Sequence, residues 1–435
     1  MKTQISIERR KQQFAWAFYD WANSVYSLVI TTAIFPIYFS SILSNYQEVS
    51  VFGINFSDKG ILYSYSITAS FVIVVLISPI LSAVADQIGN KKLFLKIFSW
   101  LGALGCSSLF FFTNYESLWI GISGSILASI GYWGSLVFYN AYLPEIASKD
   151  QQDRLSAVGF IYGYLGSAIL LIICLVLIML VDESFTRYSF LLVALWWIGF
   201  AQFTFARLPK SYTRPAQVNR NRLLFFSHVE LIKVGAELAR YRELKFYLFS
   251  FFLLSVGIQT INYMATIFGK DELGLNETKL IITILLIQFV AVVGSWLFSR
   301  LSKKLGNLNA LKIGLVIWAL ICMSAFLMHR TDKYIEYEFY ALGATVGLVL
   351  GGVQALTRST YSKLLPVTND NTIYFSFYDI VEKVALILGS FIFAQVLYLT
   401  GSMQYSALTL SIFFISSILL LSYVKLKLPS QTEIK

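Results

Sequence analysis

Charged residues are scarce in this sequence. Asp, Glu, Lys and Arg make up only 13% of it, whereas 57% of its residues are hydrophobic. An average soluble domain carries about 25% charged residues. A chain of 435 residues with so little polar surface cannot cover itself in water. The composition therefore excludes an ordinary soluble protein and indicates a chain whose solvent is the lipid bilayer.

Cysteine and histidine are also rare. Cys106, Cys174 and Cys322 are isolated within apolar runs, and the two histidines are His228 and His329. No CxxC pair or HExxH motif occurs, so a disulfide framework, a metal site and any other bound cofactor are not expected. No G-x-x-x-x-G-K-[ST] loop occurs either, which argues against ATP-driven chemistry.

The net charge of +10 does not indicate nucleic acid binding, because the basic residues lie in short loops between apolar runs. With the N-terminus placed in the cytoplasm, 27 of the 34 Lys and Arg residues fall in cytoplasmic segments and six on the opposite face. Lys383 lies inside a span. This asymmetry follows the positive-inside rule and predicts both termini in the cytoplasm, most simply at a bacterial inner membrane.

Twelve apolar segments are long enough to cross a bilayer as helices, which takes about 20 residues each. Helix is expected because backbone polar groups in hydrocarbon must pair within their own segment. The sequence therefore predicts an all-α membrane protein with spans at 14–42, 60–84, 92–113, 117–141, 154–181, 185–207, 245–269, 278–300, 308–328, 336–362, 372–399 and 402–425.

The chain divides near its middle. A hydrophilic stretch, 208–244, separates a six-span half at 1–207 from a second at 245–435, and part of it has the pattern of an amphipathic surface helix. The loop SAVADQIGNKK after span two is echoed by SRLSKKLGNLN after span eight, with Gly89 and Gly306 in matching places. The echo predicts two similar bundles joined by a linker.

Six plus six spans with a long middle loop resemble the major facilitator superfamily. The loop between spans two and three resembles the superfamily's Gly-x-x-x-Asp-basic-x-Gly-basic-basic signature. Asp86, Gly89, Lys91 and Lys92 match this signature. The match is partial, because Ser82 replaces its first glycine and Gln87 and Asn90 replace basic residues. The resemblance implies the major facilitator fold of two pseudo-symmetric six-helix bundles.

Three segments are similar to a narrower family, the fungal vacuolar effluxers linked to autophagy and their bacterial relatives. The resemblance implies a twelve-span carrier, with amino acids as the solutes moved by fungal members. Bacterial relatives often carry an acidic residue where this chain has Val256. A coupling role of that acidic residue therefore cannot be assigned to this chain. The segments are WAFYDWANSVYSLVITTAIFPIYF (16–39), GIQTINYMATIFGKDELGL (257–275) and QALTRSTYSKLLP (354–366).

Polar residues in the first span of each half share one helical face. Span one carries Asp20, Asn23 and Ser27, and span seven carries Gln259 and Asn262 at similar spacing. Polar groups at membrane depth are costly and are candidates for lining a substrate cavity. Hydrogen bonding between helices is the alternative explanation for the same pattern.

Span eleven carries Asp379, Glu382 and Lys383. Asp379 and Lys383 are four residues apart and can pair along the helix, which leaves Glu382 without an obvious local partner. Glu382 is therefore a candidate proton carrier, with Asp20 as its rival. The alternative is a structural charge network in which Glu382 finds a partner on another span.

Two further groups have more than one interpretation. In span ten, Gln354 and Arg358 could face the cavity, with Arg358 binding a substrate carboxylate, or Arg358 could be a cytoplasmic anchor. The loop that holds Asp86, Gly89, Lys91 and Lys92 is expected to act in gating, because the superfamily's aspartate sits near the N-terminus of span eleven. It could equally be only a correctly oriented polar loop.

The sequence thus predicts a monomeric secondary carrier that moves a small polar solute by alternating access, either proton-coupled or by exchange. Small-molecule substrate, protons and lipid are the expected partners, and nucleic acid is not. The alternative is a non-transporting receptor or sensor built on a carrier fold. An intramembrane enzyme would need a metal cluster or an activated nucleophile, and neither pattern is present.

Overall fold

The computed structural model is almost entirely helical. Its described part contains twelve helical segments long and apolar enough to cross a membrane, and each coincides with a predicted span. The prediction of a twelve-span all-α protein is therefore confirmed. The structure describes residues 2–46, 48–51, 53–56, 59–209, 234–238, 240–366, 368 and 371–425.

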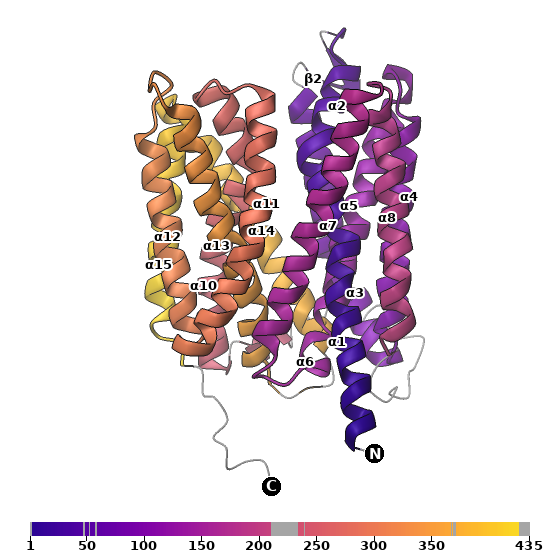
Figure 1. The fold of residues 1–435 in the computed structure, drawn as a ribbon, viewed down its shortest axis with the longest axis vertical. Helices are drawn as coiled ribbons and strands as arrows, with labels where there is room; N and C mark the ends of the chain where they lie inside the picture. The colour runs from indigo at the N-terminus through magenta and orange to yellow at the C-terminus, as the bar shows by residue number, and fades with distance from the viewer. Residues whose placement is uncertain are drawn as a thin grey trace. The chain divides into compact units, whose positions relative to one another are not determined.

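The first six spans are built from α-helices with short insertions (Figure 1). The first span is longer than predicted, because α1 begins in the basic N-terminal segment and continues without a break into the apolar run. The elements are α1 (Lys2–Val25), η1 (Tyr26–Ile34), α2 (Phe35–Ile42), β1 (Val49–Val51), β2 (Ile54–Phe56), α3 (Lys59–Ile88), α4 (Lys91–Ser108), η2 (Leu109–Phe111), η3 (Tyr115–Ser117), α5 (Leu118–Asn140), α6 (Leu143–Ile146), α7 (Gln152–Leu180) and α8 (Phe185–Arg207).

The second six spans follow the same plan. The predicted amphipathic helix of the linker falls mostly on residues 210–233, which lie outside the described residues. The elements after the linker are α10 (Arg242–Ile267), η5 (Phe268–Glu272), α11 (Glu277–Leu305), α12 (Asn307–Leu327), α13 (Ile335–Leu364), α14 (Asn371–Thr400) and α15 (Met403–Leu421).

Helix packing repeats between the two halves. In the first half α5 packs on α3 and α4, and α8 packs on α1 and α4. In the second half α13 packs on α11 and α12, and α15 packs on α10 and α12, which are the equivalent pairs (Figure 1). Gly89 and Gly306 end the equivalent helices α3 and α11 with φ angles of 66° and 82°, a conformation that favours glycine.

The first span of each half also contains a π-helical segment, η1 in the first and η5 in the second. Hydrogen bonds in a π-helix run from residue i to i+5, and such segments are rare and often occur at functional sites. Pro36, the second residue of α2, lies just after η1 and cannot donate a backbone hydrogen bond, so the regular ladder is interrupted there.

The chain forms two compact units that do not coincide with its two halves. Unit 1 comprises Met1–Gln151, Val158–Leu231 and Asn369–Asp379, and unit 2 comprises the remaining segments, Gln152–Ala157, Ile232–Thr368 and Ile380–Lys435. The first turns of α7 and α14 are thus each grouped with the half to which their helix does not belong.

Close helix packing generates a stability prediction. A Cβ atom on Gly294 of α11 would overlap the backbone carbonyl of Leu348 on α13, which cannot move aside as a side chain can. We expect Gly294→Leu to lower the free energy of unfolding by about 1–3 kcal/mol or more through overpacking. Gly199→Leu is the control, because a Cβ on Gly199 meets nothing within 4 Å. Thermal unfolding in detergent compares them, and equal melting temperatures would contradict the packing.

Candidate functional site

Asp20 is held in the interior of unit 1. Its side chain is 5% exposed, and the Tyr139 hydroxyl of α5 donates a hydrogen bond to Asp20 Oδ2 over 2.8 Å. Trp16 stacks on the Tyr139 ring at 4.5 Å, and its indole N–H donates to the Tyr139 carbonyl. The Asp20 carboxylate therefore lies among aromatic side chains that hold each other in place. A negative charge in such surroundings is costly unless it is paired or takes up a proton.

The polar residues that follow Asp20 run into η1. Asn23 is fully buried, Ser27 and Thr31 are half-buried, and the three are spaced four residues apart. A π-helix turns less per residue than an α-helix, so this spacing keeps them close to one line. Among the described residues, Asn23 Nδ2 and Thr31 Oγ1 have no hydrogen-bond partner. These two groups are buried and keep an unused hydrogen-bonding capacity.

Glu382 in α14 has partners. Gln259 Nε2 in α10 donates to Glu382 Oε1 over 2.5 Å, and Lys383 Nζ lies 3.5 Å from Glu382 Oε2. Glu382 thus has a partner on another span, and its role as proton carrier or as part of a structural network stays a prediction. Asn262, three residues after Gln259, is half-buried on the same helix. Asp379 is buried, and its pairing with Lys383 stays a prediction.

Arg358 is buried in unit 2 rather than extended to the membrane surface. Its Nε donates to Ser156 Oγ and its Nη2 to the Ser156 carbonyl, each over 2.9 Å. The alternative of a snorkelling surface anchor does not fit this position. Gln354, one turn earlier, is half-buried. The roles of Gln354 and Arg358 in binding substrate stay predictions.

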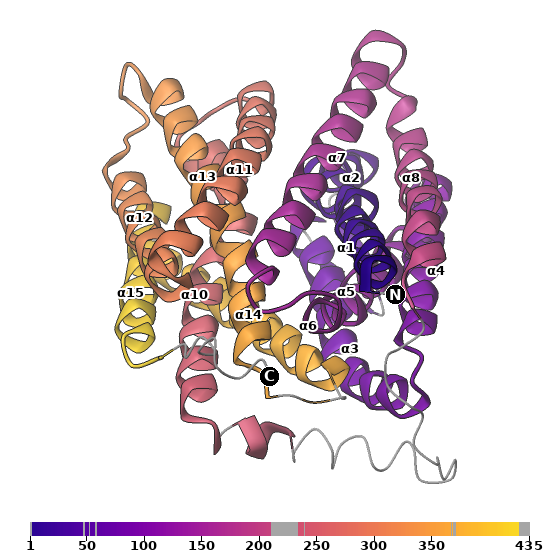
Figure 2. The same ribbon diagram turned by 60° about the horizontal axis from the view of Figure 1, so that its bottom comes forward.

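Asp86, near the end of α3, caps the N-terminus of α14 within unit 1. Figure 2 shows the two helices α3 and α14 meeting there. Asp86 Oδ2 accepts the backbone N–H of Ile373 over 3.0 Å, and Oδ1 accepts that of Thr372 over 3.4 Å. A carboxylate is stabilised there by the unpaired N–H groups and by the helix dipole. The resemblance implies this contact, and the role of Asp86 in gating stays a prediction.

The two lysines of the same loop are engaged as well. Lys91 is buried, forms an ion pair with Glu145 and lies 4.8 Å from the centre of the Tyr142 ring. Glu145 also accepts a hydrogen bond from Asn371 Nδ2 at the start of α14. We call Asp86, Lys91, Glu145 and Asn371 the Asp86 cluster. Lys92 donates to the Leu208 carbonyl over 2.7 Å.

A second charge cluster lies in unit 2, and the sequence did not predict it. Asp153, in the first turn of α7, accepts hydrogen bonds from Lys363 Nζ over 2.6 Å, from Asn307 Nδ2 over 2.7 Å and from Ser302 Oγ over 3.2 Å. We call these four residues the Asp153 cluster. Asp153 and Lys363 are both buried. One sequence feature could have indicated this cluster: Asn307 directly follows Gly306 in the loop that repeats between the two halves.

The Asp86 cluster and the Asp153 cluster occupy equivalent places in the two halves. The side that supplies the carboxylate in one cluster supplies the hydrogen-bond donors in the other. In unit 1 the α3–α4 junction and the segment after α5 supply carboxylates to the first turn of α14. In unit 2 the α11–α12 junction and the end of α13 supply donors to a carboxylate in the first turn of α7. The second half therefore has an equivalent contact, in which the first turn of α7 supplies the acid.

No metal site accompanies these groups in the part of the chain that the structure describes. No set of three or more His, Cys, Asp or Glu side chains is placed to hold an ion there. The three cysteines are buried free thiols. The groups described above can bind polar solutes or exchange protons.

Solved structures resemble the fold along nearly the whole chain. The human organic anion transporter MFSD10 matches with a TM-score of 0.71 and 14% identity, covering 95% of this chain and 99% of its own. The major facilitator proton:xylose symporter XylE matches with a TM-score of 0.70 and 14% identity, covering 95% of each chain. The expected major facilitator fold is confirmed.

Sequence comparison identifies the family. The uncharacterized MFS-type transporter YxiO of Bacillus subtilis is 31% identical over 431 residues, covering 97% of this chain and 96% of its own. Autophagy-related protein 22 of Kluyveromyces lactis is 25% identical over 388 residues, covering 82% of this chain and 77% of its own. The family model described as "Vacuole effluxer Atg22 like" matches residues 8–431. The chain is a multi-pass membrane protein that belongs to the Atg22-like family of major facilitator-type transporters and is not an enzyme.

Proposed function

We propose that this protein is a secondary carrier that moves a small polar solute by alternating access, with amino acids as the solute class and protons as the coupling ion. The observation that carries the proposal is a carboxylate within a span of each unit, Asp20 and Glu382, each hydrogen bonded to a neutral polar side chain. Ionisable groups inside membrane spans are costly and mark solute or proton paths.

Glu382 has the surroundings of a proton carrier. As a carboxylate it accepts from Gln259 and attracts Lys383, whereas a protonated Glu382 would itself become a donor and would lose the attraction to Lys383. Proton uptake would therefore change contacts between α10 and α14. Asp20, whose partner Tyr139 can donate or accept, is the second candidate.

We assign Asp86, Gly89, Lys91 and Lys92 to gating. The Asp86 cluster holds the first turn of α14, and the Asp153 cluster holds the first turn of α7. Release of these two turns is the proposed step that opens the cytoplasmic side.

The substrate contacts are proposed at the lines of polar residues on the first span of each half. We assign Asp20, Asn23 and Ser27 to solute binding in the first half. We assign Gln259, Asn262, Gln354 and Arg358 to it in the second half. The charge asymmetry supports a bacterial cytoplasmic membrane with both termini inside. One chain carries both halves, 1–207 and 245–435, joined by the 208–244 linker, so the working unit is a monomer.

The solute class is tested first by binding and then by flux. The purified protein is heated with amino acids, sugars, peptides and nucleosides in turn. An amino acid present at 100 times its Kd is expected to stabilise the fold by about 2.7 kcal/mol. Liposomes containing the protein should then accumulate that solute faster with an inward proton gradient than at equal pH. Binding without flux at either pH would favour a receptor over a carrier.

The coupling assignment is tested by neutralising each carboxylate. Glu382→Gln should reduce proton-driven accumulation at least about tenfold while keeping solute exchange, because the side chain no longer takes up a proton. Glu338→Gln, on an exposed carboxylate of α13, is the matched control and should change neither. Asp20→Asn tests the rival. If Glu382→Gln and Asp20→Asn both leave proton-driven accumulation intact, neither residue is the coupling group.

We expect a large coupling energy between Lys363 and Asp153, because their side chains form a buried ion pair. Lys363→Met should lower the free energy of unfolding by about 3–5 kcal/mol, because it leaves the Asp153 carboxylate without its cation. The second change, Asp153→Asn, should then cost much less than it does alone. The exposed pair Lys270–Glu277, with side chains 59% and 58% exposed, is the control and should show about 0–1 kcal/mol. Additive effects at Asp153 and Lys363 would contradict the cluster.

A further inference from the structure

The first turn of α15 is held by two elements of unit 2 that are distant from it in sequence. The first is η5, whose last residue is Glu272. Glu272 Oε1 accepts the Ser402 hydroxyl over 2.9 Å, and Oε2 accepts the backbone N–H of Met403 over 3.0 Å. Ser402 Oγ in turn accepts the backbone N–H of Gln404 over 3.2 Å and so caps the helix. A carboxylate therefore ties η5 to the start of α15.

The second element is the end of α12, which the Gln404 side chain contacts. Gln404 Nε2 donates to the Met328 carbonyl and lies 3.3 Å from His329 Nδ1. A carbonyl oxygen can only accept, so the amide nitrogen of Gln404 must point this way. His329 Nδ1 therefore faces a donor and has to be the unprotonated nitrogen of a neutral imidazole. We call Glu272, His329, Ser402 and Gln404 the α15 junction.

A protonated His329 is incompatible with this contact. Both ring nitrogens of a charged imidazole carry a hydrogen, so Nδ1 would present a donor to the Gln404 amide nitrogen, which is itself a donor. Asp332 offers the charged ring another partner, because its Oδ2 already accepts the backbone N–H of His329 over 2.9 Å. The imidazole thus has a different partner for each protonation state, and histidine is the side chain whose charge ordinarily changes within the physiological pH range.

Charged groups of both signs surround the α15 junction. η5 and the segment between α12 and α13 supply Lys270, Asp271, Glu272, Arg330, Asp332 and Lys333. Lys270 pairs with Glu277, and Glu336 at the start of α13 pairs with Lys279 of α11. α15 itself has no charged side chain from its first residue to its last. Acidic and basic groups are thus balanced here, and neither sign of charge dominates around His329.

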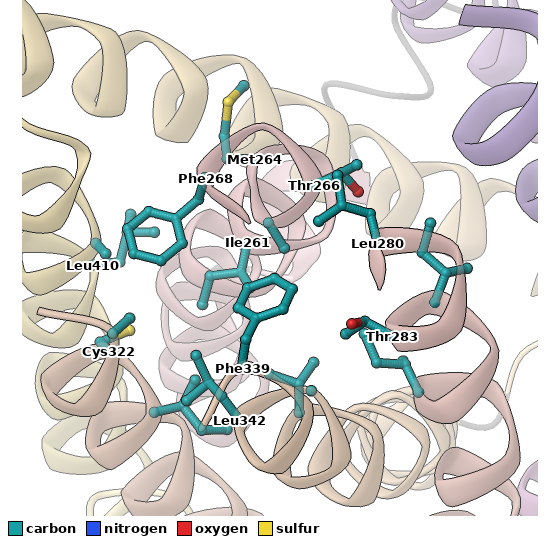
Figure 3. Close-up of a pocket in the computed structure, with 18 of the residues that line it drawn as sticks. Ile261, Met264, Thr266, Phe268, Leu280, Thr283, Cys322, Phe339, Leu342 and Leu410 are labelled. Atoms are coloured by element: carbon teal, nitrogen blue, oxygen red, sulfur yellow. The ribbon is translucent and has the colours of Figure 1, made fainter. Parts of the chain in front are cut away.

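An apolar cavity of about 90 Å³ adjoins the three elements that the α15 junction connects (Figure 3). Phe268 of η5, Ala325 of α12 and Ala407 of α15 line it, each three or four residues from a member of the junction. A void forfeits dispersion contacts along its walls, and the apolar contacts that remain are non-directional. The polar contacts of the junction therefore fix how these elements are placed, and the cavity leaves them room to shift.

We propose that His329 is a proton sensor on the membrane face where α15, the last of the twelve spans, begins. With a neutral ring, the α15 junction holds η5 and the end of α12 on the start of α15. When His329 takes up a proton, its ring turns to Asp332, Gln404 is released, and the three elements shift into the cavity. Because η5 directly continues α10, the shift reaches the helix that carries Gln259. The sensor is distinct from the two carboxylates assigned to coupling.

Hydrogen–deuterium exchange of the purified full-length protein tests the sensor without any transport measurement. Exchange is compared at about pH 8 and about pH 5, the range in which histidine ordinarily titrates, and corrected for the intrinsic effect of pH. Protection of the backbone amides in η5 and in the first turns of α15 should fall at least about fivefold at the lower pH, while the other spans keep theirs. Equal protection of these segments at both pH values, or a loss spread over all spans, would overturn the proposal.

Three variants separate the sensor from its surroundings. His329→Gln cannot take up a proton, yet its amide oxygen can still accept from Gln404, so protection at pH 8 should stay and the pH response should vanish. Glu338→Gln, on an exposed carboxylate in the first turn of α13, is the matched control and should respond as the unchanged protein does. Glu272→Gln weakens the tie to η5 and should lower protection at both pH values. A full pH response in His329→Gln would show that His329 is not the sensor.

Discussion

A charged side chain buried among apolar helices needs a partner, and the polar architecture of this protein follows from that requirement. Lys91 and Lys363 are almost fully buried, and each meets a carboxylate, Glu145 and Asp153 respectively. Breaking such a pair leaves an uncompensated charge at low dielectric, which costs far more than losing a surface pair. The N-terminal turns of α7 and α14 are therefore positioned by charged contacts, whereas close packing holds the membrane-spanning parts of the helices.

The same constraint separates two kinds of interior within unit 2. The part around Glu382 and Gln259 is polar and hydrogen bonded. Farther along α10 lies an apolar cavity of about 90 Å³, which is lined almost wholly by apolar side chains (Figure 3). Polar and apolar interiors therefore follow each other along the same helix.

The twelve spans and the twofold repetition could be predicted, because hydropathy and the Gly89–Gly306 echo are local in sequence. The contact of Asp86 with α14 could be anticipated from a family resemblance. The partner of Glu382 could not be named, since Gln259 is 123 residues away and helix periodicity does not determine which spans touch. In the sequence, Asp153 and Lys363 lie just outside the predicted spans and would be assigned to loops. Their burial against each other is visible only in the folded structure. The π-helical turn of η1 has no residue pattern that distinguishes it from an α-helix.

The division of α7 and α14 between the two units has a mechanical consequence. Each helix is continuous, yet its first residues, 152–157 of α7 and 371–379 of α14, are grouped with one unit and its remainder with the other. Moving either of these segments away from the helices that it contacts must bend the helix at that boundary. Glu382 lies three residues beyond the boundary in α14, so a bend there would alter its distance from Gln259. The protonation of one carboxylate and the flexing of one helix would then be a single event.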